Sequence, residues 1–116
     1  MEFKFHYDKE DDVLAIYSPN SKYSESIEYD ENLVIDLDKD GNVIGIEIFD
    51  ASEFLHAFND FVNKEFLENL EKAYLEYKEF RNKIFLILVL KSKSGFVKQP
   101  MPLIRKVEYK SPLLTA

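Results

Sequence analysis

The segment from residue 36 to residue 47 constrains the fold of this chain most, because its sequence allows either a calcium loop or a β-hairpin. It reads DLDKDGNVIGIE and fits the pattern D-x-D-x-D-G-x5-E of an EF-hand loop. Such a loop needs a helix on each side. Here the flanks, residues 33–35 and 43–49, are rich in β-branched residues and alternate as half-buried strands do. We therefore predict a hairpin that turns at residues 38–41.

The predicted hairpin also determines where the acidic side chains of the segment lie. A turn centred on residues 39 and 40 pairs Ile35 with Ile44 and places Val43 on the opposite, solvated face with Asp36 and Glu47. In this register Asp36 and Glu47 are staggered by about four residues, roughly 13 Å along the strands. We therefore predict no metal and no cofactor. The carboxylates of the calcium alternative are those of Asp36, Asp38, Asp40 and Glu47.

Several short motifs in the first half of the chain carry a resemblance to a known family. They are Tyr7-Asp8, Asp11-Asp12-Val13-Leu14, Ser24-Glu25-Ser26, Asp38-Lys39-Asp40-Gly41, Gly45-Ile46-Glu47-Ile48 and Ala51-Ser52. Over residues 2–55 their spacing resembles that of the prokaryotic domain-of-unknown-function family 2283. The resemblance implies a curled antiparallel meander followed by a helix. It implies no established activity, but it does imply that some relatives lie beside small toxin-like genes, so an antitoxin-like role is one expectation.

The fold class expected for the chain is α+β: an antiparallel β-meander packed by one long or broken helix, with a C-terminal β segment. With 116 residues, of which 46% are hydrophobic, the chain can form a single domain with one core. In this domain residues 2–55 hold the family-like meander and the start of the helix, and residues 56–116 add the rest of the helix and a basic β extension. The predicted strands of the meander are near 2–7, 12–18, 25–29, 32–37 and 42–49.

A helical segment is predicted to follow the meander. Asp50 is a favourable N-cap, and Glu53 could complete a capping box. Large apolar side chains recur at intervals of three to four residues from Phe54 to Phe80. One helix over residues 51–81 would be about 45 Å long, too long for a domain of this size, so a break is expected at residues 59–63. We expect the aromatic stripe to pack on the apolar face of the meander.

The last third of the chain is predicted to be β structure. Residues 84–90 form an uninterrupted apolar run, which suits a central buried strand. Residues 91–95 then turn the chain, and residues 96–97 and 103–109 could pair back. Pro100 and Pro102 confine that returning segment to a sheet edge or to irregular structure.

Charge is distributed unevenly along the chain, whose net charge is −7. Residues 1–60 contain four lysines against sixteen acidic residues, whereas residues 61–116 contain eleven basic against six acidic residues. The basic segment could steer an acidic partner, including the acidic half of a second copy, or it could contact phosphates. A chance imbalance on a charged surface is the alternative. The candidate partner-binding residues are Lys91, Lys93, Lys98, Arg105 and Lys106.

The sequence offers little support for catalysis. His6 and His56 have no second ligand at metal-binding spacing, there is no cysteine, and no G-x-S-x-G or phosphate-binding loop is present. No signal-peptide pattern or bilayer-length apolar run occurs, so we expect a cytoplasmic protein without membrane contact.

We predict a non-catalytic protein-interaction module that is not an enzyme. Its partner would be another protein or a second copy, with a homodimer favoured. The alternatives are nucleic-acid binding through the basic C-terminal segment, assisted by stacking on Phe96 or Tyr109, and calcium binding at residues 36–47.

Overall fold

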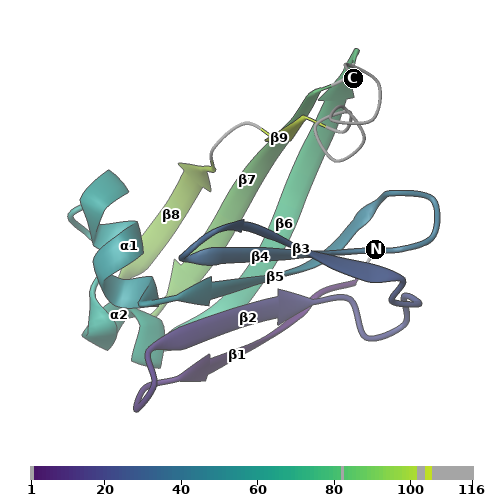
Figure 1. Cartoon of the computed structure of the whole chain (residues 1–116). Coiled ribbons are helices and arrows are strands. Elements are labelled where there is room, and N and C mark those ends of the chain that lie inside the picture. The colour runs from purple at the N-terminus through teal and green to yellow at the C-terminus, as the bar shows by residue number, and fades with distance from the viewer. Residues whose placement is uncertain (1, 82, 102–103, 106–116) are drawn as a thin grey trace.

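The structure is a computed structural model that describes residues 2–81, 83–101 and 104–105, and in this part of the chain two antiparallel sheets pack beside two short helices (Figure 1). The predicted α+β class is therefore confirmed. In chain order the elements are β1 (Lys4–Asp8), β2 (Val13–Tyr17), β3 (Glu25–Asp30), β4 (Leu33–Leu37), β5 (Val43–Phe49), α1 (Ala51–Phe58), α2 (Lys64–Glu68), β6 (Leu70–Phe80), β7 (Lys83–Ser92), β8 (Gly95–Pro100) and β9 (Ile104–Arg105).

The first sheet contains the five strands that were predicted, in the order β1-β2-β5-β4-β3. β5 is the central strand, because it pairs with β2 on one side and with β4 on the other. Every second residue of β2 and β4 is buried, as the alternating sequence requires. β1 and β3 are left at the two edges of this sheet.

The predicted register of the β4–β5 hairpin is wrong by two residues. Ile35 pairs with Ile46 rather than Ile44, because the connection is a five-residue loop instead of a two-residue turn. The loop is closed by hydrogen bonds from the Asp38 N–H to the Asn42 carbonyl and from the Gly41 N–H to the Asp38 carbonyl. Gly41 has φ +81°, a conformation that glycine adopts without strain.

A register irregularity next to this loop also corrects the side-chain assignment. Between Asp36 and Leu37 the pairing shifts by one residue, so Leu37 lies opposite Val43. A bulge of this kind moves one residue to the other face of the sheet. Val43 is therefore fully buried in the hydrophobic core, not on the solvated face where it was predicted.

The predicted helix ends far earlier than expected. Its break at residues 59–63 is confirmed, since α1 ends at Phe58 and α2 begins at Lys64. Residues 70–80, however, form strand β6. Ala73 and Leu75 are buried and Tyr77 is half-buried, whereas Lys72 and Glu76 are exposed, which is a period of two and not of 3.6. Pairing along the apolar strand β7 overrides the helical spacing of the aromatic residues.

The second sheet has β7 at its centre, between β6 and β8, and β9 pairs with the far end of β7. The predicted central strand at residues 84–90 is thus confirmed. Pro100 lies at the end of the edge strand β8, as expected for proline. Residues 96–97 pair back on β7 as part of β8, as predicted. Of residues 103–109, only 104 and 105 are described, in β9, and the rest lie outside the described residues.

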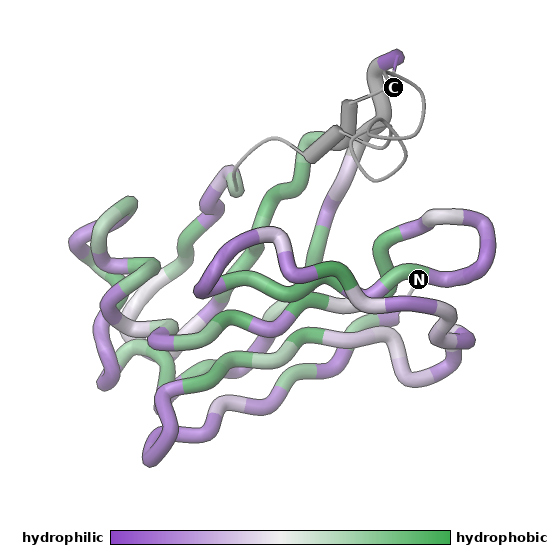
Figure 2. The backbone as a smooth tube through the Cα atoms, in the orientation of Figure 1, coloured by the Kyte–Doolittle hydropathy of each residue, from purple (hydrophilic) through white to green (hydrophobic). Residues whose placement is uncertain are grey.

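The core lies between the inner faces of the two sheets, which Figure 1 shows one behind the other with their strands crossing at an angle. Leu14, Ile35 and Ile46 of the first sheet belong to the same buried cluster as Leu75 and Leu88 of the second. Figure 2 shows hydrophobic residues along the strands where the sheets overlap and hydrophilic residues in the turns. The second sheet, not a long helix, therefore covers most of the apolar face of the first sheet.

The helices close one end of this core. Leu55, Val62, Phe66 and Leu67 are buried there, while Phe58 remains 50% exposed. The predicted aromatic stripe is therefore only partly a core feature. In the described part of the chain, neither helix is long and apolar enough to cross a bilayer.

Candidate functional site

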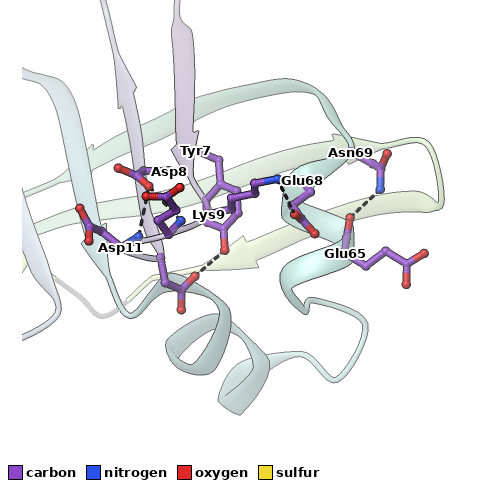
Figure 3. Close-up of polar contacts among 9 residues, drawn as sticks. Tyr7, Asp8, Lys9, Asp11, Glu65, Glu68 and Asn69 are labelled. Atoms are coloured by element: carbon purple, nitrogen blue, oxygen red, sulfur yellow. Dashed lines mark hydrogen bonds and ion pairs between the residues drawn. The ribbon is translucent and has the colours of Figure 1, made fainter.

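A buried polar cluster joins the β1–β2 turn to the first turn of α1. The carboxylate of Asp12 accepts hydrogen bonds from the Tyr7 hydroxyl at 2.6 Å, the Ser52 hydroxyl at 2.7 Å and the Ser52 backbone N–H at 3.1 Å. In Figure 3 a dashed line leads from the Tyr7 hydroxyl to a carboxylate, and this line is the hydrogen bond to Asp12. The Asp12 carbonyl also accepts from the Ala51 N–H.

Asp12 replaces the cap that was predicted from local sequence. Asp50 stands at the N-cap position of α1, but it has φ +52° and its side chain makes no capping hydrogen bond. The predicted capping box of Asp50 and Glu53 is therefore wrong. The free N–H of Ser52 in the first turn is instead bound by the Asp12 carboxylate, 40 residues away in sequence, so a tertiary contact satisfies a donor that a local cap would bind.

The environment of Asp12 keeps its carboxylate ionised. Burial would raise the pKa of Asp12, but hydrogen bonds from Tyr7 and Ser52 outweigh it and lower the pKa overall. Burial, together with the hydrogen bond to Asp12, raises the pKa of the Tyr7 phenol far above its usual range. Because the Ser52 hydroxyl and backbone N–H both donate to Asp12, this cluster anchors α1 to the first sheet.

Two carboxylates of the calcium alternative, those of Asp38 and Asp36, accept hydrogen bonds within the first sheet and its loop. The backbone N–H of Asn42 is the main group that lowers the pKa of Asp38, and the Asn42 side chain and the Asp40 N–H add to it. Asp36 accepts a 2.5 Å hydrogen bond from the Ser26 hydroxyl. Asp36 lies opposite Gly45 and Glu47 opposite Val34, a stagger of two residues or about 7 Å. Within the described residues, no group of three or more His, Asp or Glu side chains is placed to hold a metal ion.

We expect calcium to leave this hairpin unchanged, because Asp38 already accepts three hydrogen bonds from the loop. Amide NMR spectra recorded in EDTA and in millimolar calcium should superimpose. Saturable shifts confined to residues 36–47 would contradict the structural role of these carboxylates.

The outer face of the second sheet carries the other candidate residues. We define the basic face as the outward residues of β6, β7 and β8 together with the β7–β8 turn. Cross-strand pairing aligns its rows: Lys72, Lys91 and Phe96 form one row, and Tyr74, Val89 and Lys98 form the next. Phe96 is 56% exposed on this face. The remaining outward residues are Glu76, Phe85, Ile87 and Pro100, and Lys93 lies exposed in the turn.

The structure brings together three of the five partner-binding residues predicted from sequence. Lys91, Lys93 and Lys98 lie at this end of the second sheet. Arg105 pairs with Lys83 at the opposite end of β7, about 26 Å from Lys91 along the strand. Lys106 lies outside the described residues. Lys72 joins the set and was missed, because its segment was predicted to be helical.

Two lysines of this face oppose each other directly. Lys72 and Lys91 are cross-strand partners in β6 and β7. Like charges in this position destabilise a sheet. Lys98, in contrast, pairs with Glu76 across β7 at 3.3 Å. The Lys72–Lys91 pair therefore has no evident benefit for folding and is suited to binding a negatively charged group.

Three comparisons with known proteins bear on this chain. Residues 4–52 match the family model described as Protein of unknown function (DUF2283). The uncharacterised protein MJ0789 of Methanocaldococcus jannaschii is 38% identical over 56 residues, which are 48% of this chain and 47% of that protein. A Methanosarcina mazei protein named "Putative hypoxanthine phosphoribosyltransferase" is 37% identical over 78 residues, which are 66% of this chain and 58% of that protein.

These matches cover only about half of either relative. No solved structure matches the chain. The enzyme name of the Methanosarcina mazei protein does not establish catalysis by this chain. The family match spans all five strands of the first sheet together with Tyr7, Asp12 and Ser52. The predicted resemblance is therefore confirmed: residues 4–52 of this chain match the DUF2283 family of proteins of unknown function.

Proposed function

We propose that this chain is a cytoplasmic, non-catalytic protein-interaction module that binds an acidic surface of another protein on its basic face. The observation that carries the proposal is the Lys72–Lys91 cross-strand pair beside the exposed ring of Phe96. Exposed aromatic side chains are enriched at binding surfaces, and the neighbouring lysines would steer an acidic partner. An antitoxin-like role, in which the partner is encoded by a neighbouring gene, is the form of this proposal that the family resemblance favours.

Nucleic-acid binding is the second candidate for the same face. Phe96 is exposed enough to stack on a base, and lysines flank it. Two observations argue against nucleic-acid binding. The chain has a net charge of −7, and Glu76 lies on the same face, ion-paired with Lys98. A folded acidic partner tolerates such mixed charge better than a phosphate backbone does, because its own basic side chains can pair with Glu76.

The geometry also bears on the predicted homodimer, which stays a prediction. The outer face of the first sheet is acidic, with Glu28, Asp36 and Glu47 beside one lysine, Lys4. Because the inner faces of the sheets pack together, the acidic and basic faces point in opposite directions. In a two-fold dimer each copy would have to place its acidic face on the basic face of the other copy, and faces that point in opposite directions cannot do both at once. Copies stacked head to tail would pair acidic with basic faces but would form an open chain and not a closed dimer. This geometry favours a foreign partner.

The test compares two probes of equal negative charge, an acidic peptide and a single-stranded DNA of the same length. We expect the peptide to shift the amide signals of Lys91, Phe96 and Lys98 and to bind more tightly than the DNA. The double variant Lys91→Glu and Lys93→Glu should weaken peptide binding about tenfold or more, since it reverses two charges at the surface.

The matched control reverses two exposed lysines in loops of the first sheet, Lys22→Glu and Lys39→Glu. It makes the same change in net charge away from the basic face and should leave binding within about twofold. Equal losses in both variants would show a non-specific effect of net charge. Tighter binding of the DNA, with a steep loss of affinity in salt, would replace the proposal with the nucleic-acid alternative.

A further inference from the structure

A groove separates the free edges of the two sheets. Within the described residues, β1 is one edge strand of the first sheet and β6 is one edge strand of the second, and neither pairs with the other (Figure 1). The groove between them has a volume of about 670 Å³ and is lined by residues 2–5, residues 71–75 and Tyr17. This volume is in the range of binding sites for small ligands and short peptides, roughly 300–1,000 Å³.

The walls of this groove are suited to an extended chain. An edge strand presents a row of unpaired backbone N–H and C=O groups, which is a template for a further strand. The five lining residues of β6 span about 17 Å, so an added strand of about five residues fits beside them. Strand addition of this kind obtains its affinity from backbone hydrogen bonds and its selectivity from alternate side chains.

The side chains along the groove define what such a strand would carry. On the inward side, Ala73 and Leu75 are core residues, and Phe5 is half-buried against the same core. This side favours apolar residues at alternate positions of the added strand. The charges along the groove are balanced, because Lys4 and Lys72 are matched by Glu2 and Glu71. The other positions therefore favour uncharged polar residues.

We propose that the groove between β1 and β6 accepts an extended segment of a partner protein in which apolar residues alternate with neutral polar ones. The segment adds as a strand to the free edge of β6, whose five lining residues match its length. This site adjoins the basic face, with which it shares Lys72 and Tyr74, but it does not depend on the charge of that face, because backbone groups recognise the segment.

The experiment uses the whole chain and an acetylated, amidated heptapeptide without charged residues, Gln-Thr-Val-Thr-Val-Thr-Gln. Its binding should shift amide signals at residues 2–5 and 71–75 and slow their hydrogen exchange. Affinity should change less than about twofold between low and high salt, unlike binding to the basic face. Two further peptides are N-methylated. The first carries methyl groups on both valine amides, and the second carries them on the threonine amides. At least one of them should bind about tenfold or more weakly, since it lacks donors for the strand edge.

Two controls separate this proposal from the preceding one. The Lys91→Glu and Lys93→Glu variant changes residues that do not line the groove, so it should bind the neutral heptapeptide as the wild type does. β3 and β8 are free edges without this groove, so their amide signals should stay unchanged. The proposal is wrong if the peptide does not bind at about 1 mM or if the shifts lie on β3 or β8. It is also wrong if both N-methylated peptides bind as tightly as the unmodified heptapeptide.

Discussion

Replacing Leu88 by alanine should lower the free energy of unfolding by about 2–5 kcal/mol. Leu88 is fully buried at the centre of β7 and belongs to the cluster that joins the two sheets. Its removal leaves a cavity between them, which adds to the lost hydrophobic transfer energy. Urea unfolding followed by circular dichroism measures the change, with an m-value that should stay near that of the wild type.

The neighbouring residue Ile87 provides the matched control. It points to the outer face of the second sheet and is only half-buried, so Ile87→Ala should cost about 1–2 kcal/mol. The two variants remove similar side chains from adjacent positions on opposite faces. A larger loss for Ile87→Ala than for Leu88→Ala would show that the outer face is the buried one and would contradict the packing of the two sheets.

Replacing Asp12 by asparagine should destabilise the fold by about 2–4 kcal/mol, because an amide nitrogen then faces donors that the carboxylate oxygen accepted. Asparagine tolerates the left-handed backbone of this position, φ +55°, so the change isolates the loss of the carboxylate. The control is Asp11→Asn, an exposed neighbour, which should change stability by less than about 0.5 kcal/mol. Thermal and urea unfolding measure both, and equal losses would contradict the capping role of Asp12.

The same variant should reveal the pH dependence of this cluster. The lowered pKa of Asp12 means that its carboxylate binds a proton less readily in the folded chain than in the unfolded chain. Its stabilisation is complete above the unfolded value of about 4 and is lost as pH falls through the lower folded value. The difference in stability between wild type and Asp12→Asn should therefore be constant near neutral pH and shrink below about pH 4. A difference that grows with acidity would contradict the assigned hydrogen bonds.

The candidate sites were only partly visible in the sequence. Lys91, Lys93 and Lys98 could be singled out because they lie within one short basic segment that a turn brings together. Lys72 could not, since its position beside Lys91 depends on pairing between β6 and β7. The groove between β1 and β6 could not be predicted at all, because its walls are about 70 residues apart in sequence.

The hairpin at residues 33–49 shows how far local sequence reaches. Alternating β-branched residues and the glycine at 41 were sufficient to predict two strands and their turn. The register was not determined locally, because several loop lengths are compatible with Asp38-Lys39-Asp40-Gly41. The five-residue loop and the bulge beside Leu37 follow from hydrogen bonds and packing that only the folded hairpin contains.

By itself, the sequence determined the strands of the first sheet, the break between α1 and α2, and the central apolar strand β7, because each has a strong local pattern of hydrophobic residues and breakers. The tertiary structure decided the state of residues 70–80. Their aromatic residues fit a helix by spacing, yet a strand buries Ala73 and Leu75 against the core and pairs with β7. It also decided that Asp12 and not Asp50 binds the first turn of α1. Both outcomes depend on contacts between distant segments, whose energies exceed the local preferences of either segment.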